Sequence, residues 1–305
     1  MSLNLPESFK ELLKSKFESA VDSGSLKFTE SHEELVQDGD ITFKVRIAPS
    51  LAQKPILRQD EQPKSNFNPF LKPEPDLYLA PLGSDYSLVL NKFSIVPYHF
   101  LCITKDFKPQ SSPLSERDLE ATWECLNTAI EGSKILAFYN CGKLSGASQD
   151  HKHIQFIPIP ESAQLLPDIA LTYGLEQSKD AIGQFPARHP NVPFTHFVLP
   201  LPKAPVGEDL AMIFSSLLAR TLTALRNYNQ SKIAFNFAMT KDWMFIAPRT
   251  QESYDDIAIN STGMVGMLLV KSEEQFEKIK QLGPLTLTSS VGIPKAEIDE
   301  KHEDY

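Results

Sequence analysis

The segment 145–157 constrains the fold of this chain more than any other part of the sequence. From residue 151 onward, polar and apolar side chains alternate, which is the pattern of a β-strand with one face on a core. Ile154 and Phe156 would face that core. The residues on the opposite face are His151, His153 and Gln155. The preceding loop, 145–148, is small and polar, and the backbone N–H groups of such a loop can bind an anion. The segment therefore predicts a strand that presents two histidines beside an anion-binding loop.

The composition is that of an ordinary soluble globular protein. Of 305 residues, 41% are hydrophobic and 23% are charged, and the length allows one large domain over residues 1–305. The sequence has no apolar run of the roughly 20 residues that cross a bilayer. Residues 1–7 lack the basic and apolar regions of a signal peptide. These features favour a protein that does not associate with membranes.

Charge and cysteine content narrow the possible partners and the compartment. The net charge of −9 argues against broad nucleic-acid binding, which depends on a basic surface. The three cysteines are odd in number and widely spaced, as expected in a reducing compartment. We therefore expect a protein of the cytoplasm, with the nucleus as an additional location. No oligomerisation stripe is visible, so we expect a monomer.

The order of the predicted elements indicates an α+β fold. Helices are predicted at 6–23, 115–130, 208–228 and 273–282, and the second begins with a capping box, Ser115 and Asp118. The predicted strands and the apolar run at 264–270 lie between them. The strands are 41–47, 77–80, 86–92, 98–105, 134–139, 151–159, 194–199, 233–239 and 243–247. A Pro-rich loop occupies about 48–76. This order predicts a largely antiparallel sheet with peripheral helices in one domain.

The residues themselves leave three readings of His151-x-His153 open. Two surface histidines on a strand would need no function. Two imidazoles two residues apart can also bind one metal ion, although the other histidines supply no second pair. These others are His32, His99, His189, His196 and His302. Third, an imidazole with a pKa of about 6.5 is largely neutral at pH 7 and can attack phosphorus without a separate base.

Catalysis at phosphorus makes further demands that the flanking residues can meet. The imidazole needs a fixed tautomer, a cradle for the phosphate oxygens and a donor to the charge that develops. The 145–148 loop and Gln155 are of suitable types for the last two tasks. The motif His-x-His-x-Gln resembles the transferase branches of the histidine-triad superfamily, whereas the hydrolase and binding branches carry a third histidine in place of Gln155. In galactose-1-phosphate uridylyltransferases the middle residue is typically proline, and here it is Lys152.

Most of the chain resembles the fungal diadenosine tetraphosphate phosphorylases (ATP adenylyltransferases) of this superfamily. The resemblance rests on six collinear blocks, which are far more specific than the histidine pair alone. They are residues 48–55, 90–97, 138–142, 148–153, 196–202 and 259–271. It implies a histidine-triad-like fold and transfer of an adenylyl group through a covalent AMP–histidine intermediate on His153. His151 would support the reaction, and Gln155 would bond phosphate oxygens. Inorganic phosphate would then release the AMP as ADP.

The resemblance also implies a set of substrate-binding residues and a reaction partner. These residues are Lys54, Asn91, Lys92, Asn140, Ser145, Gly146, Ala147, Ser148, Gln155, Asn260, Ser261, Thr262, Met267 and Lys271. Ala147 departs from the serine expected in the family, which would remove a hydroxyl but not a backbone cradle. Taken singly, each has an ordinary structural explanation, such as a solvated lysine at Lys54 or a core position at Met267. A divalent cation, Mg²⁺ or similar, would accompany the polyphosphate without a tightly bound protein metal.

Two further cations and two competing functions complete the hypotheses. Lys241 and Arg249 flank a predicted strand and are candidate cations near a polyphosphate. The predicted function is phosphorolysis of diadenosine tetraphosphate to ADP and ATP. The same scaffold could instead hydrolyse dinucleoside polyphosphates asymmetrically, or bind nucleotides as a sensor without catalysis. The expected ligands are the dinucleotide, ATP, ADP and phosphate.

Overall fold

The computed structural model describes residues 3–51, 68–128, 130–177 and 186–295. Lys54 and most of the Pro-rich loop predicted at 48–76 lie outside these residues. The part of that loop before the gap forms the short 3₁₀ helix η1 (Pro49–Leu51). The part after it, from Asn68, approaches the two histidines of the motif.

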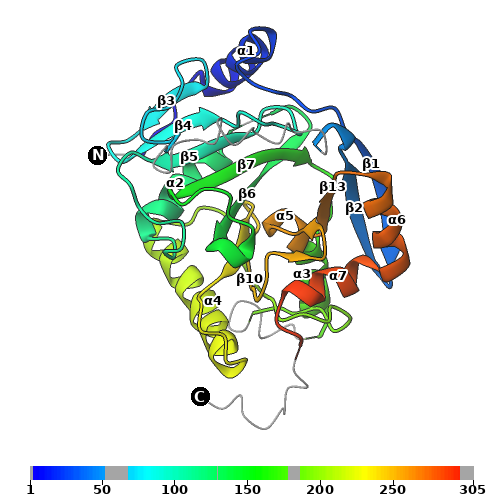
Figure 1. Ribbon diagram of the computed structural model, residues 1–305. Coiled ribbons are helices and arrows are strands. Elements are labelled where there is room, and N and C mark those ends of the chain that lie inside the picture. Colours follow the sequence, from blue (N-terminus) through cyan, green and yellow to red (C-terminus); the bar gives the residue numbers. More distant parts are fainter. Residues whose placement is uncertain (1–2, 52–67, 129, 178–185, 296–305) are drawn as a thin grey trace.

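An eight-stranded sheet forms the centre of the molecule (Figure 1), in the order β3-β4-β5-β7-β6-β9-β10-β8. Every neighbouring pair in it is antiparallel. The strands are β3 (Tyr78–Leu82), β4 (Tyr86–Leu90), β5 (Phe100–Thr104), β6 (Ser133–Cys141), β7 (His153–Pro160), β8 (Phe197–Pro200), β9 (Phe235–Met239) and β10 (Trp243–Pro248). This confirms the predicted α+β class with a largely antiparallel sheet.

Two smaller sheets were not predicted in this form. β1 (His32–Asp38) pairs antiparallel with β2 (Ile41–Ile47), and β2 pairs parallel with β13 (Met267–Val270). β1 is mostly exposed and lacks the alternation that reveals a strand in sequence. The two-residue strands β11 (Ser253–Tyr254) and β12 (Ile257–Ala258) form a separate ribbon. The parallel pairing places Met267 opposite Lys44, far from it in the sequence.

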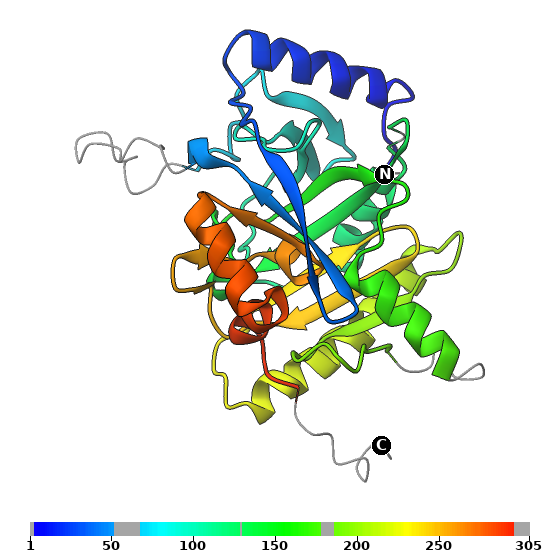
Figure 2. The same ribbon diagram turned by 90° about the vertical axis from the view of Figure 1, so that its right-hand side faces the viewer.

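Helices cover both faces of the large sheet, as Figures 1 and 2 show. They are α1 (Phe9–Asp22), α2 (Glu116–Leu126), α3 (Leu166–Gln177), α4 (Gly207–Asn227), α5 (Ser261–Met264), α6 (Glu273–Leu282) and α7 (Pro284–Val291). Apolar residues of α1, α2 and α4 share one core with one face of the sheet. Those of α3, α6, α7 and the three-stranded sheet share a second core with the other face. No helix of the described residues has both the length and the apolar character that a membrane crossing requires.

Local signals in the sequence account for several of these elements. The predicted capping box begins α2: Ser115 Oγ accepts from the N–H of Asp118 (3.2 Å), and Asp118 Oδ2 accepts from the N–H of Ser115 (2.8 Å). The helix predicted at 208–228 is α4. The apolar run at 264–270 is divided, because α5 ends at Met264 and a turn at Gly266, with φ of 101°, precedes β13.

The alternation that led to the strand prediction is present in β7. Ile154 and Phe156 are buried in the core beneath α1 and α2, whereas Ile157 belongs to the core of the other face. The predicted strand is too long at one end, since β7 begins at His153 and not at His151. His151 makes only an isolated antiparallel bridge with Pro109.

Candidate active site

His153, the first residue of β7, has its imidazole fixed in one tautomer. Its Nδ1 lies 2.8 Å from the backbone carbonyl of His151, so Nδ1 carries the proton and donates it to that oxygen. The lone pair is then on Nε2, which no hydrogen bond occupies within the described part of the chain. Burial lowers the pKa of His153 to about 4, so the ring is neutral at pH 7. A neutral, oriented imidazole with a free Nε2 is the form that a nucleophile requires.

Gln110 holds the backbone of His153 in place. Its side-chain oxygen accepts from the N–H of His153 (2.8 Å), and its Nε2 donates to the carbonyls of His153 (3.2 Å) and Asn140 (3.0 Å). Gln110 is itself fixed through its backbone carbonyl, which accepts from the Tyr139 hydroxyl at 2.7 Å. These bonds connect His153 to β6 and to the loop before α2. Gln110 was not identified from the sequence.

His151 supports the site through its backbone and is neutral as well. Its Nε2 donates to the carbonyl of Thr104 (2.7 Å), and its Nδ1 accepts from the amide of Asn68 (3.0 Å). Burial lowers its pKa. The Phe70 ring covers both histidines, with ring centroids 5.8 Å from His151 and 5.1 Å from His153. Asn68 and Phe70, which follow the part of the Pro-rich segment outside the described residues, therefore pack against the two histidines on one side.

His99 orients the amide of Gln155. The Asn91 amide donates to Nδ1 of His99 at 2.9 Å, so the proton of this second imidazole is on Nε2. Nε2 then donates to the side-chain oxygen of Gln155 at 3.2 Å. With its oxygen bound in this way, Gln155, which lines the cavity described below, keeps its NH₂ group as a donor. Burial lowers the pKa of His99 to about 4, so its imidazole is neutral at pH 7.

A cavity of about 200 Å³ lies beside Asn91, His99 and Gln155. Five of the residues that the sequence analysis selected line this cavity, and they come from segments far apart in the chain. These are Asn91, Gln155, Asn260, Thr262 and Met267. Its walls combine polar side chains with apolar ones, as in sites for small organic ligands. The apolar side chains include Phe138, Ile157 and Leu268. Two cations on β2, Lys44 and Arg46, and Glu33 on β1 also line the cavity and were not predicted.

The loop at 142–148 offers only part of the anion cradle that was predicted. The N–H of Ser145 donates to the carbonyl of Gly142, and the N–H of Gly146 donates to that of Lys143, both at 3.1 Å. The Ser145 hydroxyl is buried and also bonds to Gly142, at 2.6 Å. The N–H groups of Ala147 and Ser148 have no partner among the described residues. The loop therefore has two backbone donors left for an anion. One of them is the N–H of Ala147, which an alanine supplies as well as a serine would.

Gly146, within this loop, packs tightly against Ile259 and Asn260. Its φ is 86°, a left-handed conformation that favours glycine. A Cβ atom there would lie 3.1 Å from the carbonyl oxygen of Ile259 and 3.2 Å from the Cβ of Asn260. Any side chain at this position would push the loop away from the segment that carries Asn260. Gly146 thus brings two predicted parts of the site together.

Asn140 and Ser261 lie in a buried hydrogen-bond network behind the cavity. The Asn140 side-chain oxygen accepts from the N–H (2.9 Å) and hydroxyl (2.7 Å) of Ser261, and from the Asn236 amide (2.9 Å). Asn236 also donates to the carbonyl of Ser145 at 2.9 Å. The carbonyl of Tyr139, 2.9 Å from the Ser261 hydroxyl, is an alternative acceptor for its single proton. The amide nitrogen of Asn140 has no hydrogen-bond partner among the described residues.

Arg249 is not the free cation that the sequence analysis hypothesised. It is fully buried, and its five N–H groups are all engaged. Their acceptors are the carbonyls of Val291, Ile259, Gln251 and Glu252 and the side-chain oxygen of Asn236. Burial lowers its pKa to about 9. Arg249 therefore supports the network from behind and has no donor left for a phosphate.

Three of the predicted lysines do not line the cavity. Lys92 pairs with Glu74 at 2.7 Å, Lys271 is exposed before α6, and Lys241 is exposed in the turn between β9 and β10. Lys54 lies outside the described residues. In the described ranges, no group of three or more His, Cys, Asp or Glu side chains could hold a metal ion.

Comparisons with known proteins identify relatives of the whole chain. Two family descriptions match: the Ap4A phosphorylase N-terminal domain over residues 2–172 and the ATP adenylyltransferase C-terminal domain over residues 190–294. Diadenosine 5',5'''-P1,P4-tetraphosphate phosphorylase 2 of Saccharomyces cerevisiae is 36% identical over 300 residues, which cover 91% of each chain. Protein APA1 of the same yeast is 34% identical over 298 residues, or 92% of each chain.

Solved structures give the same result. The crystal structure of yeast Ap4A phosphorylase Apa2 in complex with AMP has a TM-score of 0.84 and 32% identity, and covers 97% of this chain and 100% of its own. The complex of Apa2 with Ap4A has a TM-score of 0.82 and 31% identity, and covers 95% and 99%. The fold, the His-x-His-x-Gln site and these relatives together define a nucleotidyltransferase of the histidine-triad superfamily. Within it, the chain belongs to the Ap4A phosphorylase family.

Proposed function

We propose that this enzyme phosphorolyses diadenosine tetraphosphate (Ap4A) with inorganic phosphate, giving ADP and ATP. The observation that carries the proposal is the state of His153: Nδ1–H is bound to the carbonyl of His151, and Nε2 is free. Both the family and the complex of a relative with Ap4A support this choice of substrate. The reaction runs in two transfers of one AMP group.

In the first transfer, Nε2 of His153 attacks the α-phosphorus of one adenosine. The N–P bond forms as the bond from phosphorus to the bridging oxygen breaks, and ATP leaves with that oxygen. The ring becomes positively charged, and the carbonyl of His151 stabilises the Nδ1–H through the 2.8 Å hydrogen bond. The Gln155 NH₂ and the N–H groups of Ala147 and Ser148 are the donors for the phosphoryl oxygens.

In the second transfer, an oxygen of inorganic phosphate attacks the AMP phosphorus. The P–N bond breaks, its electron pair returns to Nε2, and ADP is released with the neutral imidazole restored. Both steps are reversible, so ATP and ADP can re-form the dinucleotide and phosphate. A divalent cation would arrive with the polyphosphate as part of the substrate and would neutralise charge on the leaving ATP.

Gln155 distinguishes this chemistry from hydrolysis. An amide cannot titrate near neutrality, whereas a third imidazole at this position could activate water. The Phe70 ring also covers His153 and reduces the access of water to it. Both features favour an intermediate that persists until phosphate arrives.

The dependence on phosphate tests the proposed function. With Ap4A and phosphate, the products should be ADP and ATP in equal amounts. Without phosphate, turnover should stop after one ATP per enzyme. Chromatography of the nucleotides at both conditions measures this. Continued production of AMP and ATP without phosphate would identify an asymmetric hydrolase instead.

The lowered pKa of His153 predicts the pH dependence of the first transfer. The reactive form is neutral, and its folded pKa of about 4 is below the value of about 6.5 for a free imidazole. The single-turnover rate of AMP transfer should therefore stay level from neutral pH down to about pH 5. It should fall about tenfold per pH unit below pH 4. A rapid-quench series without phosphate measures this, and a rate that halves near pH 6.5 would contradict the assignment.

A further inference from the structure

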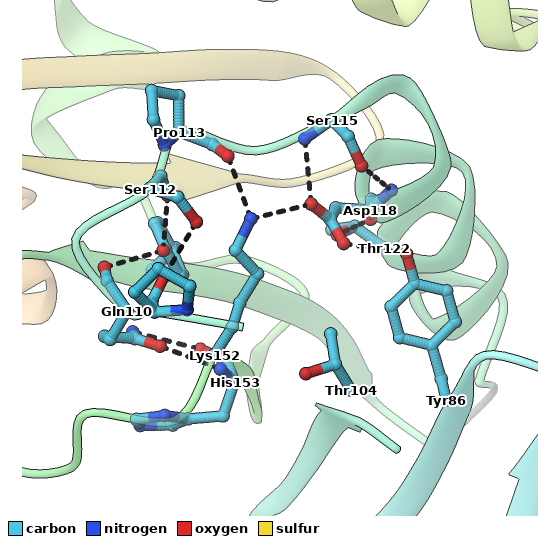
Figure 3. A network of polar contacts seen from close by, with 12 residues as sticks. Tyr86, Thr104, Gln110, Ser112, Pro113, Ser115, Asp118, Thr122, Lys152 and His153 are labelled. Carbon is cyan, nitrogen blue, oxygen red and sulfur yellow. Dashed lines mark hydrogen bonds and ion pairs between the residues drawn. The ribbon is translucent and has the colours of Figure 1, made fainter. Parts of the chain in front are cut away.

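Lys152, between the two histidines of the motif, is a buried lysine that plays no part in the proposed chemistry. Its side chain is 5% exposed and leaves the backbone away from the His153 ring (Figure 3). Lysine is almost never buried without a partner, because its charge loses solvation. Here Nζ donates to Asp118 Oδ2 at 3.0 Å and to the carbonyl of Pro113 at 2.9 Å. The contact joins the motif to the start of α2.

Asp118 is buried more deeply, with 1% of its side chain exposed, and each of its oxygens has a donor. Oδ2 accepts from Lys152 and from the N–H of Ser115 at 2.8 Å, and Oδ1 accepts from the Tyr86 hydroxyl at 2.7 Å. Burial alone would raise the pKa of Asp118, but the Lys152 ammonium and these bonds hold it below its usual value. The pair is therefore a buried ion pair in which both Asp118 oxygens are hydrogen-bonded (Figure 3).

The backbone on both sides of Lys152 carries the bonds that orient the nucleophile. The N–H of Lys152 donates to the carbonyl of Lys108 at 2.8 Å, and its carbonyl accepts from the N–H of Thr104 at 3.2 Å. The preceding carbonyl, that of His151, fixes the tautomer of His153. Pro113 belongs to the same loop as Gln110, which binds the His153 backbone. The ion pair thus joins three elements whose positions determine where Nε2 lies.

We propose that Lys152 and Asp118 are positioning residues, whose buried ion pair holds the 151–153 segment so that Nε2 of His153 faces the α-phosphorus. A buried ion pair contributes little net stability compared with neutral groups of similar size. Its loss from both sides should therefore affect geometry more than folding. This inference rests on the proposed function, because AMP transfer to His153 is its readout.

The test is the double variant Lys152→Met/Asp118→Asn, which removes both charges and keeps the shape of the carboxyl group. We expect its Tm to stay within a few degrees of wild type and its Kd for AMP to stay within about threefold. The single-turnover rate of AMP transfer at saturating Ap4A should fall roughly 100-fold, the loss expected from misplacing a reacting group by about 1 Å. The control is Arg117→Met/Glu120→Gln, which removes an ion pair of 2.9 Å from the same helix. That control should transfer AMP at the wild-type rate.

A second measurement separates positioning from a general loss of structure. In ¹⁵N NMR spectra of histidine-labelled protein, His153 of the wild type should be a single tautomer with the proton on Nδ1. The double variant should show a mixture of tautomers. If the double variant does not fold, Lys152→Gln/Asp118→Asn undergoes the same two measurements, because a single substitution would leave the other charge buried without a partner. A wild-type rate with an unchanged tautomer in a folded variant would overturn the inference, whereas a wild-type enzyme that takes up no AMP would overturn the proposed function.

Discussion

Replacing His153 with alanine is expected to reduce the turnover of Ap4A by about 10⁴-fold or more, since removing a covalent nucleophile costs losses of this order. Alanine removes Nε2, the atom that we propose attacks the α-phosphorus. The remaining groups of the cavity should still bind AMP, because they belong to other residues. Steady-state rates with purified variant, together with the Kd for AMP, measure both effects.

The matched control for His153→Ala is His196→Gln. His196 is also buried, and burial also lowers its pKa to about 4, but it bonds to the backbone of Phe194 and His189. We expect this control to keep most of its turnover. If His153→Ala binds AMP and retains more than a few per cent of wild-type turnover, His153 is not the nucleophile. If the wild type binds AMP but shows no turnover at all, the sensor function is supported instead.

Replacing Arg249 with methionine is expected to cause the largest loss of stability, about 3–5 kcal/mol, because several buried acceptors lose their donor at about 1–3 kcal/mol each. The guanidinium satisfies four backbone carbonyls and the side-chain oxygen of Asn236 in the interior. Methionine removes the donor from the carbonyls of Ile259 and Gln251 and from the Asn236 side-chain oxygen, and buried polar groups without partners are costly. The carbonyls of Val291 and Glu252 keep bonds from backbone N–H groups. Because Asn236 also binds Asn140 and Ser145, the loss should loosen the 142–148 loop.

Thermal and denaturant unfolding measure this effect. The expected fall in Tm is on the order of 10 °C for a chain of this size. The control is Lys241→Met, at an exposed position in the turn before β10, which should leave the Tm within about one degree of wild type. A Tm of Arg249→Met equal to that of the control would show that the buried network is not needed for stability.

Local sequence signals predicted the parts of the fold that depend on near neighbours. The alternation around residues 154–156 predicted β7 and its two faces, and the pair Ser115 and Asp118 predicted the start of α2. Both signals act over a few residues, so the sequence alone contains them. The predicted start of β7 was wrong by two residues. His151 instead bonds to Asn68 and Thr104, which are distant in the chain.

The site itself depends on contacts that no local pattern contains. His99 orients Gln155 from 56 positions away, and Gln110 holds His153 from 43 positions away. Neither residue belongs to a motif with recognisable spacing, although His99 follows closely after the predicted Asn91. The predicted contacts Asn91, Gln155, Asn260, Thr262 and Met267 do meet at one cavity. That result came from the family resemblance, because no single one of these residues signals a ligand.

The family resemblance selected some residues whose burial rules out contact of their side chains with a substrate. A family pattern shows which residues belong together, but it does not separate those that contact a substrate from those that support them. Ser145 and Ser261 are fully buried, and their hydroxyl groups lie within hydrogen-bond distance of backbone carbonyls. The structure therefore places their side chains behind the cavity. Substrate contact by Lys92 and Lys271 stays a prediction.

The central claim is that AMP is carried on His153, and intact-mass spectrometry tests it most directly. The enzyme is mixed with Ap4A in the absence of phosphate and quenched within milliseconds to seconds. We predict that the mass of the wild type increases by one AMP group, that the increase disappears when phosphate is added, and that His153→Ala shows none. Production of ATP from Ap4A by an enzyme whose mass stays unchanged at every quench time would contradict the account.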